Sequence, residues 1–179
     1  MSERKTQKLW TMRMVYLSLV VWVIFFNLLP LETTPRVWAG PDVLMALTFA
    51  WVVRRPEYVP PLSVALVFLL TDLLFQKPPG LQAALMLIAC EMLHKRSHGM
   101  REIFFPLEWL HTSVAVIGVT LGTRLVLAVL MVPQAPLALS LIQLVMTIIA
   151  YPLLALVSHA IFGVRRPRVN ETNAFGVRI

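Results

Sequence analysis

The stretch "LVFLLTDLLFQKPPG", Leu66 to Gly80, places a single carboxylate, Asp72, in a run of large apolar side chains. The run then closes on a lysine and a Pro-Pro-Gly turn. An apolar run bounded by proline and glycine predicts a buried or lipid-facing helix that ends at the turn. An ionisable group at membrane depth costs about 2.5–3.5 kcal/mol on insertion scales, so Asp72 needs a partner or a function.

The composition extends this interpretation to the whole chain. Of its 179 residues, 58% are hydrophobic and 14% are charged, whereas a soluble domain averages about 45–50% apolar and about 25% charged residues. The single cysteine, Cys90, excludes an internal disulfide. We expect one integral membrane domain without a soluble module. Its first apolar segment is expected to stay as a signal anchor, because no small-residue cleavage site follows it.

Polar residues and Pro/Gly pairs divide the chain into six apolar blocks. Prolines stand at or just before several block starts, where a first-turn N–H has no helical partner to lose. The predicted fold class is an all-α integral membrane protein. A six-helix transmembrane domain is expected at residues 14–162, with a basic cytoplasmic arm at 1–13 and a basic cytoplasmic tail at 163–179. The blocks are Met14–Leu31, Val43–Val53, Leu62–Phe75, Leu81–Leu93, Phe104–Met131 and Leu137–Phe162.

The second to fourth blocks are short for a membrane crossing. A helix of about 14 residues rises roughly 21 Å, against a hydrocarbon core of about 30 Å. Several explanations stay open at this point. Flanking residues extend these helices, longer helices shield them, the bilayer thins around them, or two of them are re-entrant.

The basic residues predict the orientation. If the N-terminus is cytoplasmic and the chain crosses six times, two basic residues, Arg36 and Lys77, fall in outer loops and thirteen fall inside. This asymmetry follows the positive-inside rule and predicts a multi-pass protein of the bacterial inner (cytoplasmic) membrane with both termini cytoplasmic. Topology and attraction to anionic lipid then explain the net charge of +7 without a nucleic-acid partner. The thirteen are Arg4, Lys5, Lys8, Arg13, Arg54, Arg55, Lys95, Arg96, Arg101, Arg165, Arg166, Arg168 and Arg178.

Two charges remain inside the predicted bundle. Asp72 lies near the outer end of the third block, and Arg124 lies in the outer half of the fifth. As the only opposite charges at that level, they are predicted to pair and to tie the two helices together. Alternatives stay open: Asp72 reaches the outer interface or caps the "QKPPG" turn, Arg124 reaches headgroup phosphates, or the two groups bind a proton or a substrate.

Two further features predict helix contacts. Asp42 follows Pro41 and precedes an apolar block, which favours a helix cap at the positive end of the helix dipole. Gly118 and Gly122 form a small-x-x-x-small pattern in the fifth block. That pattern permits a close helix contact, either inside the bundle or with a partner.

The inner side carries two Glu-x-x-His pairs, Glu91 with His94 and Glu108 with His111. Di-iron bundles combine such pairs with two more inward glutamates, which this sequence lacks. His94 also begins "HKRSHG", a stretch interpreted as a solvated loop. We therefore predict interfacial residues that hydrogen-bond neighbouring helices or loops, with no metal, no cofactor and no catalytic residue. No phosphate-binding, serine-hydrolase or zinc-protease motif is present.

The segment from Gly40 to Leu93, "GPDVLMALTFAWVVRRPEYVPPLSVALVFLLTDLLFQKPPGLQAALMLIACEML", resembles the MreD family of bacterial rod shape-determining proteins. The matching positions are Pro41, Asp72, Pro79 and Gly80. One position departs from the family pattern: Phe68 stands where the family tends to have a glycine four residues before the aspartate.

The resemblance implies a non-enzymatic inner-membrane scaffold of the cell-elongation machinery that supports peptidoglycan synthesis and rod shape. The implied partners are the bitopic periplasmic protein MreC, the MreB filament, and the RodA and PBP2 synthases. It also implies a fold similar to the S-components of energy-coupling-factor transporters. The alternative is a small-solute carrier of that type, with a pocket near Asp72 and Arg124 that opens outward. An intramembrane enzyme, based on the inner Glu/His set, ranks last.

Overall fold

The described part of the chain is entirely helical. The computed structural model describes residues 2–29, 38–99 and 105–162. Six α-helices and one short 3-10 turn (η1, Pro56–Tyr58) account for nearly all of these residues, and no strand occurs among them. The helices are α1 (Ser2–Leu28), α2 (Val43–Arg54), α3 (Pro61–Leu74), α4 (Leu81–Gly99), α5 (Phe105–Val129) and α6 (Leu137–Phe162).

Each predicted apolar block corresponds to one helix, but two helices run further than expected. The polar residues from Ser2 onward form the first turns of α1 and not a separate arm. α4 continues to Gly99, so the solvated loop predicted at "HKRSHG" is wrong. Lysine and arginine are good helix formers, and the helix dipole favours them in a last turn, so nothing in that stretch breaks the helix before Gly99.

Three helical segments are long and apolar enough to cross a membrane: Thr6–Leu28, Phe105–Val129 and Leu137–Phe162. α2 and α3 are apolar but shorter, with 12 and 14 residues. At 1.5 Å per residue they rise only about 18 and 21 Å, less than a hydrocarbon core of about 30 Å. By length and composition, therefore, three of the six predicted crossings are supported in the described residues.

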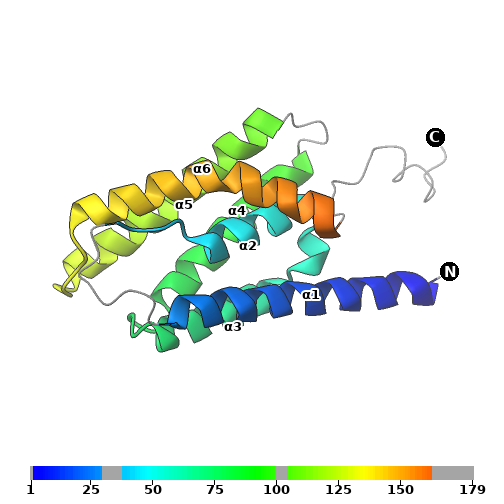
Figure 1. Ribbon diagram of the computed structural model, residues 1–179, viewed down its shortest axis with the longest axis horizontal. Coiled ribbons are helices and arrows are strands. Elements are labelled where there is room, and N and C mark those ends of the chain that lie inside the picture. Colours follow the sequence, from blue (N-terminus) through cyan, green and yellow to red (C-terminus); the bar gives the residue numbers. More distant parts are fainter. Residues whose placement is uncertain (1, 30–37, 100–104, 163–179) are drawn as a thin grey trace.

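Successive helices alternate in direction (Figure 1). The start of α1, the end of α6 and the α2–α3 turn lie at one end of the bundle, here named the Arg54 end after the last residue of α2. The α3–α4 turn and the α5–α6 connection lie at the opposite end, here named the Asp72 end. Arg54 and Arg55 at the end of α2, and Lys95 and Arg96 in the last turns of α4, are at the Arg54 end.

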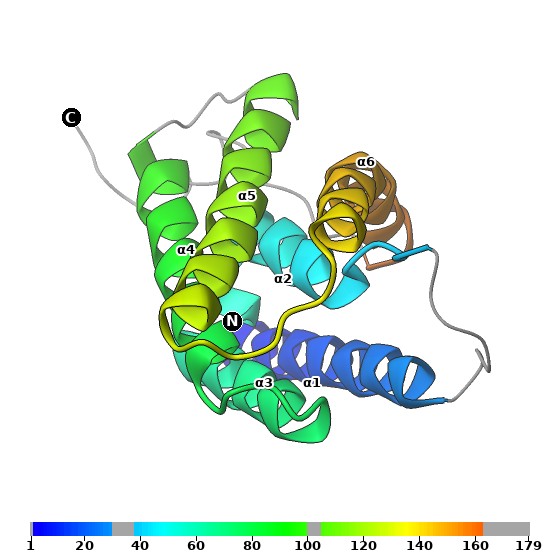
Figure 2. The same ribbon diagram turned by 90° about the vertical axis from the view of Figure 1, so that its left-hand side faces the viewer.

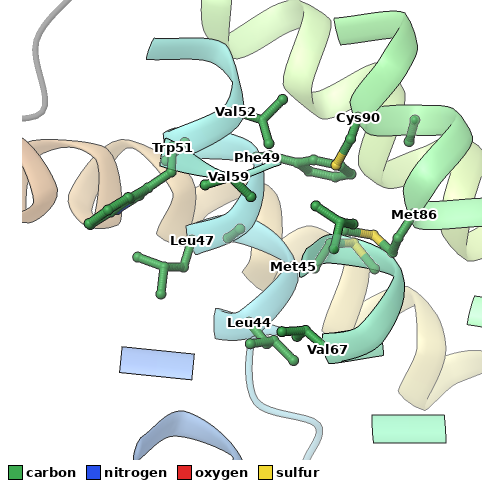
Figure 3. Close-up of a cluster of buried hydrophobic side chains, with 14 of the residues drawn as sticks. Leu44, Met45, Leu47, Phe49, Trp51, Val52, Val59, Val67, Met86 and Cys90 are labelled. Atoms are coloured by element: carbon green, nitrogen blue, oxygen red, sulfur yellow. The ribbon is translucent and has the colours of Figure 1, made fainter. Parts of the chain in front are cut away.

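The short helix α2 forms the centre of the bundle (Figure 2). It packs against α1, α4, α5 and α6, and every residue from Leu44 to Val53 is buried. Figure 3 shows Phe49 of α2 directed toward Cys90 of α4, and Leu44 beside Val67 of α3. Longer helices shield α2, which agrees with one of the explanations left open for the short blocks.

Helices α5 and α6 place apolar side chains on the outside of the bundle and several polar side chains on the inside. Leucine, isoleucine and valine side chains line the outer faces of α5 and α6 at helical spacing, whereas polar side chains of the same helices point inward. A soluble monomer rarely exposes contiguous apolar patches larger than a few hundred Å². The outer positions are Leu110, Val114, Ile117, Leu121, Leu125, Leu141, Val145, Ile149, Leu153 and Leu156. The inward polar positions are Glu108, Thr112, Thr147, Tyr151 and Ser158.

Candidate functional site: a polar chamber at the Asp72 end

Asp72 is fully buried and serves as the N-terminal cap of α4. Its Oδ2 atom accepts hydrogen bonds from the backbone N–H groups of Gly80 (3.0 Å), Gln82 (3.1 Å) and Ala83 (3.3 Å). The first N–H groups of a helix have no partner inside the helix. Gly80, with a φ of +86°, has no side chain to supply one. Asp72 supplies it from the preceding helix, and the positive end of the α4 dipole stabilises the buried charge.

The predicted Asp72–Arg124 pair is wrong. No ion pair joins them in the described part of the chain, although both residues belong to it. Arg124 Nη1 donates to the carbonyl of Ala135 (3.2 Å) and to Ser140 Oγ (2.5 Å), and Gln134 Nε2 donates to the Arg124 carbonyl (3.0 Å). Arg124 thus fixes the α5–α6 connection. The alternative that Asp72 caps the turn is confirmed, because its carboxylate accepts hydrogen bonds from backbone N–H groups at that turn.

One oxygen of Asp72, Oδ1, is buried and has no hydrogen-bond partner among the residues that the structure describes. The turn around it is held by two further contacts. The Lys77 N–H donates to the Asp72 carbonyl (2.9 Å), and Lys77 Nζ donates to Gln82 Oε1 (2.5 Å). Pro79 and Gly80, the other positions that carry the MreD resemblance here, lie in this same turn between α3 and α4. Asp72, Lys77 and Gln82 therefore hold a tight, hydrogen-bonded turn inside an apolar bundle.

The predicted cap at Asp42 is confirmed. Its Oδ1 accepts the Met45 N–H (3.0 Å), and its own N–H donates to Thr147 Oγ1 of α6 (2.9 Å). Pro41 precedes it, and the Pro41 carbonyl accepts the Val43 N–H (3.0 Å). This bond ties the start of α2, which lies toward the Asp72 end, to Thr147 in the middle of α6.

A cavity of about 220 Å³, here named the polar chamber, lies between these helix ends. It is bounded by the starts of α2 and α4, the end of α5 and the start of α6. Residues on this lining come from both the Asp42 cap and the turn after Asp72, so the chamber joins the two sites that the sequence analysis singled out. Its charged and amide-bearing lining residues are Asp42, Lys77, Gln82, Arg124, Gln134 and Gln143.

The charge of the polar chamber is positive. Lys77 and Arg124 line it, and neither takes part in an ion pair with a residue that the structure describes. The carboxylate of Asp42 also lines it but is directed to the helix N–H of Met45. Arg124 has five N–H donors, of which only those of Nη1 have a partner among the described residues. The chamber therefore offers unused donors and a net positive charge.

The two glycines of the predicted contact pattern differ. A Cβ atom on Gly122 would lie 3.3 Å from Leu85 Cδ2 of α4, whereas a Cβ on Gly118 would meet nothing within 4 Å. Gly122 therefore marks a close internal contact between α5 and α4. Gly118 is exposed on the outside of α5.

The hydrogen-bond network at the Arg54 end was not predicted from the sequence. Arg54 Nε lies 3.0 Å from Glu108 Oε1, and the same oxygen accepts the Tyr151 hydroxyl (2.8 Å). Arg54 Nη1 also donates to the Ala155 carbonyl (2.6 Å). The Arg54 side chain is 11% exposed and that of Glu108 is 5% exposed. Arg54 was assigned only to a cytoplasmic basic turn. Its position directly after eleven residues of α2, ten of them apolar, is the sequence signal for burial.

Of the two Glu-x-x-His pairs, the one in α5 shows different kinds of bonding at its two members. Glu108 bonds to α2 and α6, as predicted, and His111 Nδ1 lies 2.7 Å from the Leu107 carbonyl of its own helix. In the described ranges no group of three or more His, Cys, Asp or Glu side chains is close enough together to hold a metal ion.

Comparison with models of protein families, with curated proteins and with solved structures finds no match to this chain. The resemblance to MreD therefore rests on the positions quoted from the sequence, and what it implies is taken up as a proposal.

Proposed function

We propose that this chain is a six-crossing protein of the bacterial inner membrane that acts as a non-enzymatic scaffold of the MreD type in the cell-elongation complex. The observation that carries the proposal is the distribution of side chains on α5 and α6. The outer faces of these helices carry rows of exposed apolar side chains, whereas the buried Glu108 bonds to Arg54 of α2 and Tyr151 of α6. Such a surface fits lipid and the transmembrane helices of partners.

The alternation of the helices supports the proposed topology. An even number of crossings puts both termini on one side, and the first turns of α1 and the last turn of α6 lie together at the Arg54 end (Figure 1). The basic residues Arg54, Arg55, Lys95 and Arg96 lie at that end, which the positive-inside rule assigns to the cytoplasm. The Asp72 end then faces the periplasm.

The proposed partners are those that the resemblance implies: an MreC-like bitopic periplasmic protein, the MreB filament, RodA and PBP2. The bitopic protein is the expected direct contact in the membrane. Gly118 is the candidate position for that contact, because it leaves open space on the outer face of α5 and lets a partner helix approach closely.

Affinity capture from native membranes tests this proposal. A tagged chain solubilised from a rod-shaped bacterium is expected to recover the MreC-like protein, identified by mass spectrometry. Gly118→Leu is expected to reduce the recovery, whereas Ala84→Leu, a matched change at an exposed position of α4, is expected to leave it unchanged. Recovery of transporter ATPases in place of the MreC-like protein would contradict the proposal.

A second candidate function is favoured by the polar chamber. A solute carrier of the S-component type needs an outward-facing polar pocket, and the chamber lies at the end assigned to the periplasm. Binding of a soluble polar molecule to the purified protein would favour this function over the scaffold.

A further inference from the structure

The polar chamber continues into an apolar groove between α5 and α6. The groove has a volume of about 680 Å³ and is lined mainly by apolar side chains, among them Leu121, Leu125 and Leu141. Its lining shares Thr120, Arg124, Gln134, Ser140 and Leu144 with the chamber. A polar compartment and an apolar one therefore meet at a single boundary.

The arrangement of α5 and α6 explains this boundary. The two helices stand apart at the Asp72 end and are bridged there by the connecting segment 130–136 (Figure 2). Arg124 fixes that segment through its bonds to Ala135 and Ser140. The guanidinium therefore lies where the chamber becomes the groove, and the leucines beyond it are among the exposed side chains of the outer apolar face.

The donors at this boundary suit a phosphate group. Arg124 retains three N–H groups, those of Nε and Nη2, without partners among the described residues. A guanidinium binds phosphate oxygens in a bidentate manner, and a nearby lysine adds a point charge. Lys77 supplies that charge from the exposed α3–α4 turn. The Asp42 carboxylate faces the α2 N-terminus, so it offsets only part of the positive charge.

The volumes of the chamber and the groove suit a ligand with a compact polar group and a long apolar chain. A cavity of about 150 Å³ holds a benzene ring in a protein core, so a chamber of about 220 Å³ accommodates a compact polar group such as a glycerophosphate. The groove, with its leucine lining, matches a hydrocarbon chain. A small soluble anion would use the chamber and leave the groove empty.

We propose that the chamber and groove together bind an anionic phospholipid of the surrounding bilayer. The phosphate contacts Arg124 and Lys77, and one acyl chain lies between α5 and α6. This inference rests on the membrane location proposed above. The bound lipid fills the space between the two helices at the Asp72 end and sets their separation.

Native mass spectrometry of the detergent-purified protein tests the inference with phosphatidylglycerol as the probe. Arg124→Gln is expected to weaken retention about tenfold or more, because hydrogen bonds to charged groups contribute about 1.5–3 kcal/mol. Arg124→Lys, which keeps the charge, is expected to retain part of the binding. The matched control is Arg96→Gln, which removes an exposed arginine at the other end and is expected to have no effect.

The groove is tested by a second variant that leaves the charges in place. Ala128→Trp fills the apolar groove and is expected to reduce phosphatidylglycerol binding to a similar extent, whereas Leu66→Trp on the exposed face of α3 is expected to leave it unchanged. Unchanged binding in both Arg124→Gln and Ala128→Trp overturns the proposal, and so does equal retention of phosphatidylcholine.

Soluble glycerol 3-phosphate distinguishes a lipid from a free phosphate compound. The lipid site predicts binding of phosphatidylglycerol at concentrations at which glycerol 3-phosphate does not compete. Effective competition overturns the lipid assignment and points to a soluble phosphorylated ligand. Failure of the membrane proposal is recognised separately, since a chain that does not fractionate with membranes contradicts that proposal before any lipid is added.

Discussion

The two ends of the bundle satisfy their buried charges in different ways. At the Arg54 end, an arginine and a glutamate from different helices pair directly, and Tyr151 completes the network. At the Asp72 end, a carboxylate is paired with backbone N–H groups of α4, and the arginine on the same end holds a loop. The first arrangement binds three helices to one another; the second binds only neighbours in sequence.

This difference decides where the bundle is open. Arg54, Glu108 and Tyr151 draw α2, α5 and α6 together. The cavity beside Cys90, which lies between α2, α3 and α4, measures only about 60 Å³. No comparable side-chain bond joins α5 directly to α2 or α4 at the Asp72 end of the described structure, and the chamber of about 220 Å³ lies there. The described bundle therefore has one end joined by side-chain bonds between helices (the closed end) and one end that holds a larger cavity (the open end).

The largest expected effect comes from breaking the closed end. Glu108→Leu leaves the buried Arg54 guanidinium without its ion-pair partner, and removing one partner of a buried pair costs about 3–5 kcal/mol. Thermal unfolding in detergent checks this through Cys90, the sole cysteine, which is 5% exposed and reacts with a thiol-specific dye as the bundle unfolds.

Two variants control this measurement. Glu108→Gln keeps an oxygen for the Tyr151 hydroxyl and is expected to be less damaging than Glu108→Leu. Glu57→Gln, at an exposed glutamate of η1, is expected to change stability by no more than about 0.5 kcal/mol. If Glu108→Leu unfolds at the same temperature as the unmodified chain, the network does not hold the closed end.

A smaller effect is expected at the open end. Asp72→Ala removes the acceptor of three backbone N–H groups and is expected to cost about 2 kcal/mol, within the range of helix caps and charged hydrogen bonds. Asp42→Ala, which removes the acceptor of one N–H group, is expected to cost about 1 kcal/mol. The same dye assay measures both. Equal losses in the two variants would mean that the extra bonds of Asp72 add nothing.

Substitutions at the glycines of α5 are expected to change stability by a still smaller amount, and to raise it. Gly118→Ala enters open space and gains helix propensity, so it is expected to stabilise the chain by about 0.5–1 kcal/mol. Gly122→Ala brings a Cβ to 3.3 Å from Leu85 and is expected to lose most of that gain. Equal stabilisation by both changes would show that the Leu85 side chain of α4 moves aside for the Cβ at position 122 without a cost in stability.

The helices and their contacts differ in how far the sequence predicts them. Pro61, Gly80 and Pro136 stand at or just before the starts of α3, α4 and α6. The sequence locates these helices because helix starts depend on neighbouring residues in the chain. The Asp42 cap is local for the same reason. The cap that Asp72 provides to the turn at Gly80 was one of the alternatives that the sequence left open, and its choice over Arg124 required the folded geometry. The Arg54–Glu108 pair joins residues 54 positions apart and is not visible without knowing which helix faces meet.

The Asp72–Arg124 pair illustrates this limit and supplies the last prediction. Charge and depth alone suggested that the two residues meet, yet each has other partners in the folded chain. The free-energy losses of Asp72→Asn and Arg124→Gln are therefore expected to add in the double variant within about 0.5 kcal/mol, as for independent sites. Unfolding of the two single variants and the double variant in one detergent measures this coupling. A coupling well above that value would mean that the charges interact through the chamber, and the open end would then be bound across its helices much as the closed end is.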